Sequence, residues 1–229
     1  MLTIIHIETS TNVCSVAASC DGENVFEISN DEGLNHATML SPFVGKALDK
    51  LNELNLTPNA ISVSGGPGSY TGLRIGVSTA KGLCYGFDIP LIAIDTLQII
   101  CADAVSKLTI EKNALLCPMI DARRMEVYTA FYNADLENVK PVWAEIVTEN
   151  SFSDALEKQI VYFFGNGSDK CRKVITHPNA RFISDIEPLA SNMINLADQK
   201  FKAGKFADTA YFEPFYLKEF QATTPKKRL

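Results

Sequence analysis

The sequence predicts an α/β fold built from two similar lobes, each with the element order β-β-β-α-β-α. The hydrophobic period changes from two to about 3.6 after three strands in each half. A glycine-containing turn also follows the fourth strand of each half, at residues 65–72 and 165–167. The 229 residues, 46% of them hydrophobic, suffice for one large domain or two small lobes. A single mixed α/β domain without internal symmetry is the alternative.

The first half opens with a β-rich run and a hairpin whose turn is Asp21-Gly22. Leu40, Phe43 and Ala47 then recur at three- and four-residue steps, which predicts an amphipathic helix. The predicted elements are strands at residues 2–8, 13–20 and 25–29, a helix at about 36–54, a strand at 61–64, a glycine-rich turn at 65–72, a helix at about 70–86 and a strand at 90–95.

The second half repeats this order. Its predicted elements are strands at residues 115–121, 126–132 and 141–147, a helix at 148–158, a strand at 160–164, a turn at 165–167, a helix at 168–175, a strand at 181–184 and an amphipathic helix at 189–202. We therefore expect lobes at residues 1–106 and 107–220 and a loose basic tail at 221–229. The duplication predicts the actin-like ATPase class (ASKHA, ribonuclease H-like), in which nucleotide lies between the lobes.

Composition excludes several classes of protein. The net charge of −6 argues against a stand-alone nucleic-acid binder, and any contact with tRNA is expected to be indirect. No apolar run approaches the roughly 18 residues of a membrane span, so no membrane association is expected. The start of the chain does not have the pattern of a signal peptide. The 6 cysteines show no C-x-x-C spacing, which indicates reduced thiols and a cytoplasmic protein.

The longest motif is Ser64-Gly-Gly-Pro-Gly-Ser-Tyr-Thr-Gly-Leu-Arg-Ile-Gly76. A glycine-rich turn between strand and helix can point backbone N–H groups at an anion, but the spacing matches neither a Walker loop nor a dinucleotide fingerprint. Gly72, Gly76 and Ala80 form a stripe of small residues on the following helix. Two interpretations stay equally open here: close packing against the protein's own sheet, or a helix–helix interface with another chain.

Catalytic patterns are weak. His36 is followed four residues later by Leu40, and the chain has 3 histidines, so we expect no metal site. No serine stands in G-x-S-x-G. Glu8 and Asp121 end the first strands of the two lobes, where they could serve magnesium and water, or simply cap a turn. Arg123-Arg124 could bind phosphate or carboxylate, or be a solvated rim. With Thr9, Ser10, Gly165 and Gly167, the two carboxylates mark a degenerate nucleotide cleft, with at most weak ATP or ADP binding.

Five segments carry a resemblance to the TsaB (YeaZ) family, which takes part in making threonylcarbamoyladenosine in tRNA. They are Glu8-Thr-Ser10, His36-x-x-x-Leu40-x-Pro42, Gly66–Gly76, Asp121-Ala-Arg-Arg-Met-Glu-Val-Tyr128 and Pro214-Phe-Tyr-Leu-Lys218. Glu8 replaces a frequent Asp, which weakens any intrinsic nucleotide site. Met125 replaces a frequent Gly, so we expect the turn after Arg124 to differ in detail from that of the relatives.

The resemblance implies a non-catalytic subunit that pairs with TsaD, the enzyme that transfers threonylcarbamoyl to N6 of the adenosine beside the anticodon. It implies TsaE as a further partner and a homodimer when TsaD is missing, and it favours the interface interpretation of the small-residue stripe. The expected interface residues are His36, Leu40, Phe43, Ala47, Tyr70, Leu73, Arg74, Gly76 and Ala80. An ATP-dependent phosphotransferase using Glu8 or Asp121 is the alternative function, followed by a metallopeptidase.

Overall fold

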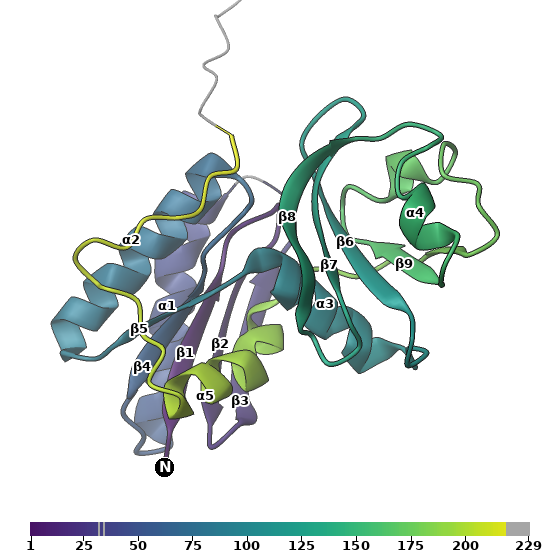
Figure 1. Ribbon diagram of the computed structural model, residues 1–229. Helices are drawn as coiled ribbons and strands as arrows, with labels where there is room; N and C mark the ends of the chain where they lie inside the picture. The colour runs from purple at the N-terminus through teal and green to yellow at the C-terminus, as the bar shows by residue number, and fades with distance from the viewer. Residues whose placement is uncertain (32, 34, 219–229) are drawn as a thin grey trace, which may run out of the picture.

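The computed structural model describes residues 1–31, 33 and 35–218, which form two five-stranded sheets joined side by side (Figure 1). The first sheet has the order β3-β2-β1-β4-β5, and the second the order β10-β9-β6-β7-β8. Read from β8 to β10, the second order repeats the first. The predicted duplication of the β-β-β-α-β unit is therefore confirmed. The strands are β1 (Thr3–Glu8), β2 (Cys14–Cys20), β3 (Glu23–Asn30), β4 (Ala60–Ser64), β5 (Leu91–Ile94), β6 (Leu115–Asp121), β7 (Glu126–Tyr132), β8 (Asn138–Ile146), β9 (Val161–Phe164) and β10 (Ala180–Phe182).

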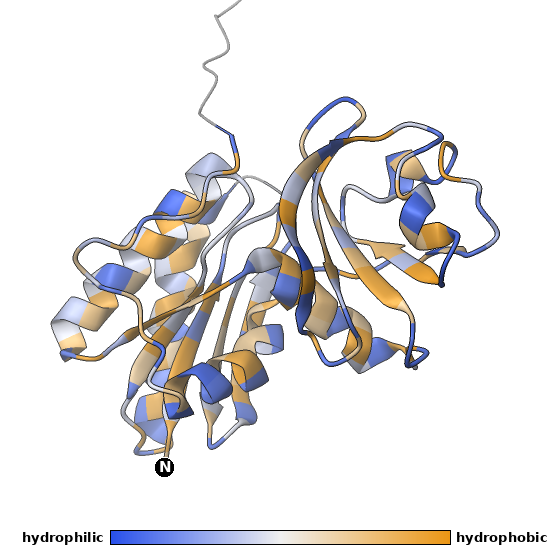
Figure 2. Ribbon diagram, in the orientation of Figure 1, coloured by the Kyte–Doolittle hydropathy of each residue, from blue (hydrophilic) through white to orange (hydrophobic). Residues whose placement is uncertain are grey.

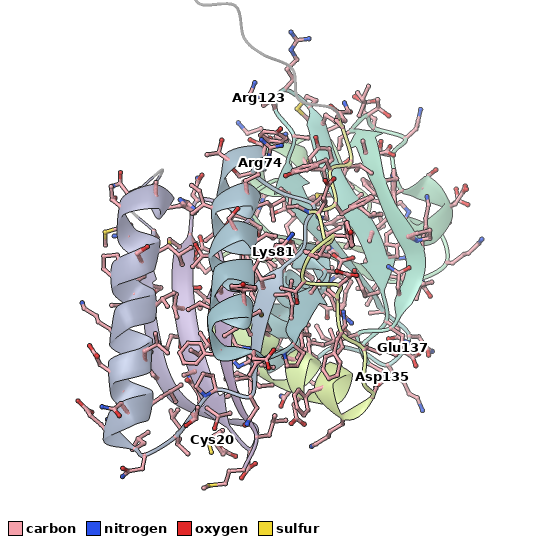
Figure 3. The ribbon with its side chains drawn as sticks, turned by 90° about the vertical axis from the view of Figure 1, so that its left-hand side faces the viewer. Cys20, Arg74, Lys81, Arg123, Asp135 and Glu137 are labelled. Carbon is pink, nitrogen blue, oxygen red and sulfur yellow. The ribbon has the colours of Figure 1, made fainter. Side chains whose placement is uncertain are left out.

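Two long helices, α1 (His36–Glu53) and α2 (Tyr70–Phe87), cover one face of the first sheet. Alternation along β1 explains how one strand serves two faces: Ile5 and Ile7 pack toward α1 and α2, and Ile4 packs on the opposite face. The two helices lie side by side over the sheet (Figure 3). Figure 2 shows hydrophobic residues along the strands and hydrophilic residues toward the loops and outer helix surfaces.

One face of each sheet is covered by a helix that follows the other sheet in the sequence. α3 (Thr96–Lys107) follows the first sheet but packs on β6 and β7, in a cluster with Leu116 and Tyr132. α5 (Ile194–Lys202), with the preceding 3₁₀ helix η2 (Ala190–Met193), follows the second sheet but packs on the first, against Ile4 and Ile92. The expected boundary at 106/107 thus separates the two sheets, but each sheet is covered by a helix from the other side of that boundary. The expected tail at 221–229 lies outside the described residues.

Three helical predictions need correction. α3 is absent from the predicted elements, because its buried residues lie on several sides and show no clean amphipathic period. The helix expected at 148–158 shrinks to α4 (Ser153–Leu156), since Phe152 has a φ of +66° and interrupts any helix beginning earlier. The helix expected at 168–175 is a single 3₁₀ turn, η1 (Asp169–Cys171). The described residues include no helix of the length and apolarity needed to cross a membrane.

Candidate functional site

The glycine-rich loop is a junction where three backbones meet. A Cβ at Gly68 would lie 2.4 Å from the Ser10 carbonyl oxygen, and one at Gly66 2.5 Å from the Phe215 carbonyl oxygen. The loop's polar groups are also engaged: Ser69 N donates to Ser10 O (2.7 Å), and Gly65 O accepts from Phe215 N (2.7 Å). The glycines therefore permit close approach of the chain's own backbone.

The small residues of α2 serve the same junction. A Cβ at Gly72 would lie 2.1 Å from Thr9 O, and one at Gly76 2.2 Å from Thr9 Oγ1. Thr9 Oγ1 donates a hydrogen bond of 2.8 Å to Gly72 O. Of the two interpretations left open by the spacing, packing within the chain is the one observed for these two glycines.

Most of the expected interface residues are buried in the protein's own core, and their prediction as partner contacts is therefore corrected. They point toward the first sheet because the apolar face of each helix supplies that core. The seven are His36, Leu40, Phe43, Ala47, Leu73, Gly76 and Ala80. His36 Nε2 is held by Thr11 O at 2.9 Å. Tyr70 is half-buried and Arg74 exposed, so these two remain near the surface.

The outer face of α1 and α2 presents small and polar residues together with the exposed ring of Tyr85. A Cβ added at Gly45, Gly82 or Gly86 would meet no heavy atom within 4 Å, so this face is open around them. Ser41 and Ser78 are exposed on the same two helices. Glycine has no side chain, so these three positions admit the close approach of another backbone. The exposed small residues thus lie at positions other than the predicted stripe of Gly72, Gly76 and Ala80, all three of which are buried.

An open cleft of about 1140 Å³ separates the β1–β2 turn and the start of α2 from the β6–β7 turn. Of the six residues expected in a nucleotide cleft, Ser10 and Asp121 line it. Glu8 and Thr9 are fully buried beneath its wall. Gly165 and Gly167 pack against the backbone of the Met119–Ile120 segment, where a Cβ would come within 2.6 and 2.9 Å of backbone atoms. Four of the six residues thus build the walls instead of lining the space.

Glu8 is fully buried beside the junction between the glycine-rich loop and the turn after β1. Its Oε1 accepts a hydrogen bond of 2.5 Å from Ser10 N, while Oε2 has no partner among the described residues. Burial raises the pKa of this carboxyl to about 7, against the opposing effect of the Ser10 hydrogen bonds. A carboxyl that titrates near neutrality and lies below the cleft wall is a poor partner for magnesium at a phosphate.

Asp121, the equivalent residue of the second sheet, is exposed and already paired. Lys170 Nζ donates to Asp121 Oδ1, and the same oxygen accepts from Arg123 N at 2.9 Å. Asn166 Oδ1 accepts from Asp121 N at 2.9 Å. Across the turn, Lys218 Nζ lies 2.6 Å from a carboxylate oxygen of Glu126. Both carboxylates of the β6–β7 turn are therefore neutralised by lysines.

Residues 205–218 form a strap that returns from α5 across the first lobe to the cleft (Figure 1). Ala207 bridges to Leu91 in the first sheet. Lys81 of α2 donates to the carbonyl oxygens of Ala210 (2.9 Å) and Phe212 (3.2 Å). Sequence reasoning matches part of this segment to the family but assigns it no role, since nothing local in residues 214–218 indicates where it docks.

The strap ends in an aromatic and basic cluster at the start of α2. The rings of Tyr70 and Tyr216 lie 4.8 Å apart, and the Arg74 guanidinium lies 4.5 Å from the Tyr70 ring. Arg74 also hydrogen-bonds Tyr216, which holds the strap to the helix. Tyr70 and Arg74 are thus placed by contacts within the chain. In the part of the chain that the structure describes, no three His, Cys, Asp or Glu side chains lie together as a metal site requires.

The repeated sheets, the exchanged helices and the cleft between the two turns define a two-lobed α/β protein of the actin-like class. A family model described as TsaD, tRNA N6-adenosine threonylcarbamoyltransferase, matches residues 33–224. A protein of Escherichia coli strain K12 named tRNA threonylcarbamoyladenosine biosynthesis protein TsaB is 31% identical over 231 residues, which cover 94% of each chain. The chain belongs to the TsaB family.

Further relatives agree with this assignment. A TsaB protein of Bacillus subtilis is 35% identical over 146 residues, and this match spans 61% of the present chain and 60% of that protein. Among solved structures, YeaZ from Pseudomonas aeruginosa is 26% identical with a TM-score of 0.76, covering 95% of this chain and 100% of that one. A second Pseudomonas aeruginosa structure, described as similar to peptidase YEAZ, has a TM-score of 0.82 at 24% identity and supports the fold.

Proposed function

We propose that this chain is a non-catalytic subunit in the synthesis of threonylcarbamoyladenosine in tRNA, and that it acts by pairing with TsaD. The role in this synthesis is supported by the names of the full-length relatives. The single observation that carries the non-catalytic part is the state of Glu8. The first-strand carboxyl is buried below the cleft wall with a pKa of about 7, so it does not face a bound phosphate.

The open outer face of α1 and α2 is the surface we assign to TsaD. Gly45 and Gly82 leave room for a partner helix, and neither residue is needed for packing within the chain. The same face would serve a homodimer when TsaD is missing, and TsaE would join the assembled pair. The proposal requires no cofactor on this chain. Weak ATP or ADP binding in the cleft, indirect contact with tRNA and a cytoplasmic location stay predictions.

The deciding experiment measures threonylcarbamoyladenosine on tRNA with purified TsaD, TsaE and threonylcarbamoyl-AMP, with and without this chain. Formation that depends on the chain supports the proposal, and equal formation without it contradicts the proposal. The isolated chain, incubated with ATP, tests the phosphotransferase alternative. ATP turnover that is lost in Asp121→Asn would establish that alternative instead.

Two variants of one exposed position test the surface. Gly82→Arg places a long charged side chain on the outer face, so pairing with TsaD is expected to be lost while the fold is kept. Gly82→Ala is the matched control, because a methyl group meets nothing within 4 Å and should preserve pairing. If Gly82→Arg binds TsaD as tightly as the unmodified chain does, the interface lies on another surface.

A further inference from the structure

The turn between β6 and β7 carries two adjacent arginines that pairing through α1 and α2 does not use. Arg123 and Arg124 are exposed and both line the cleft. Neither side chain has a hydrogen-bond or ion-pair partner among residues 1–31, 33 and 35–218. Figure 3 places Arg123 at the same end of the molecule as Arg74, at the start of α2.

The backbone of this turn is shaped to present the two side chains. Arg123 has a φ of +71° and Arg124 a φ of +49°, a left-handed conformation uncommon for arginine. The turn is held by Glu126 N donating to Arg123 O and Ala122 N donating to Glu126 O, each at 3.1 Å. The positions of both side chains at the cleft are therefore set by the turn and not by contacts of the guanidinium groups.

The carboxylates that would normally neutralise these arginines are engaged elsewhere. Asp121 is paired with Lys170, and Glu126 with Lys218 at 2.6 Å. Of the three cations in the cleft lining, Lys218 is paired with Glu126, so Arg123 and Arg124 are the two positive charges without an ion-pair partner among the described residues. This local excess of positive charge occurs in a chain whose net charge is −6, so it is a feature of the cleft and not of the whole surface.

The rest of the cleft offers groups that suit a nucleic-acid strand. The wall facing the arginines contains the exposed hydroxyl-bearing residues Ser69 and Thr71. Tyr128 and Tyr216 also line the space, and both residues are partly exposed. Cationic side chains along a backbone path, with aromatic rings beside it, are the combination by which proteins hold single-stranded nucleic acid.

We infer that this cleft binds the phosphodiester backbone of a single-stranded RNA segment, with Arg123 and Arg124 as the phosphate contacts. This inference rests on the proposed function and replaces the indirect contact with tRNA, which the net charge predicts, by a direct one. The volume of about 1140 Å³ exceeds the usual upper range of about 1,000 Å³ for small-molecule pockets.

The test measures binding of a short, labelled, unstructured RNA to the full chain by fluorescence anisotropy at several salt concentrations. Arg123→Gln with Arg124→Gln is expected to weaken binding about tenfold. The slope of log K against log salt should also fall by about 1.4, since each phosphate contact on a single strand contributes about 0.7. The matched control is Lys158→Gln with Lys173→Gln, which removes the same charge from exposed residues outside the cleft lining.

An equal loss of RNA affinity in the control pair would show a general charge effect and would overturn the inference. An unmodified chain that shows no salt-dependent binding of RNA would overturn it as well. ATP is the competitor arm: displacement of RNA by equimolar ATP would assign the cleft to free nucleotides and also overturn it. Should the double variant misfold, each single variant is expected to give about half the change in slope.

Pairing with TsaD is measured on the same variants. Retained pairing with unchanged RNA binding would overturn the inference alone, whereas a chain that binds RNA through these arginines but never pairs with TsaD contradicts the proposed function alone.

Discussion

Thr9 lies directly against Gly76: a Cβ at Gly76 would come within 2.2 Å of Thr9 Oγ1. The same hydroxyl donates a hydrogen bond of 2.8 Å to the carbonyl oxygen of Gly72. The turn after β1 is therefore locked to the first two turns of α2. The glycine spacing on this helix is a requirement of the fold, separate from any contact that the outer face makes with a partner.

Gly76→Ala is expected to destabilise the protein by about 1–3 kcal/mol, because the methyl group overlaps Thr9 in a packed core. Urea denaturation measures this change. Gly82→Ala is the matched control on the same helix: nothing lies within 4 Å, so the higher helix propensity of alanine should stabilise the protein by about 0.5–1 kcal/mol. Equal effects of the two variants would contradict the packing described at Gly76.

Leu40→Ala is expected to cost about 2–5 kcal/mol of unfolding free energy, because Leu40 is 1% exposed within the first-lobe core. Leu48→Ala, on the same helix but only half-buried, should cost less. The measurement is again urea denaturation. A negligible effect of Leu40→Ala would mean that this side chain is available to a partner after all.

Glu8 makes stability fall as the pH rises. Its pKa is raised from 4.5 to about 7 in the folded protein, so its contribution is fully present below pH 4.5 and is lost as the pH rises through 7. Glu8→Gln keeps an acceptor for Ser10 N and has no charge to bury. The stability of the unmodified protein relative to this variant should therefore fall by about 3 kcal/mol between pH 4 and pH 8. Denaturation curves of both proteins across this range measure the difference, and a constant difference contradicts the burial of Glu8.

Lys81→Met should loosen the strap, because Lys81 Nζ holds the carbonyl oxygens of Ala210 and Phe212. The N–H groups of Ala207 and Phe215, which donate to backbone carbonyl oxygens of the first lobe, are expected to exchange with solvent about tenfold faster. Lys46→Met, at an exposed lysine of α1, is the control and should leave both rates unchanged. Hydrogen–deuterium exchange at these two amides measures the difference between Lys81→Met and Lys46→Met.

Much of the fold could be predicted, because its signals are local. The Asp21-Gly22 turn and the alternating strands indicate hairpins, and the spacing of Leu40, Phe43 and Ala47 indicates a helix. Non-local packing could not be predicted in this way. Nothing near α3 shows that it meets Leu116 of the other sheet, and nothing near Phe215 shows that it docks on the glycine-rich loop.

The site could be predicted in part for the same reason. Ser10, Asp121 and the Arg123-Arg124 pair do lie at a cleft, because strand ends of one sheet face those of the next. The periodicity that identifies Leu40 also marks it as a core residue, and it does not distinguish a face that packs on the chain's own sheet from one that meets a partner. The burial of Leu40 in the structure shows that its face packs on the chain's own sheet.

The exchange of α3 and α5 has a consequence for synthesis on the ribosome. The last strand of the first sheet ends at Ile94, while the helix that covers its second face begins at Ile194, 100 residues later. Until that helix emerges, Ile4, Ile92 and Ile94 present an uncovered apolar surface. The first lobe is therefore synthesised first but completed last. The nascent chain needs its final third to cover the apolar face of the sheet that its first third has formed.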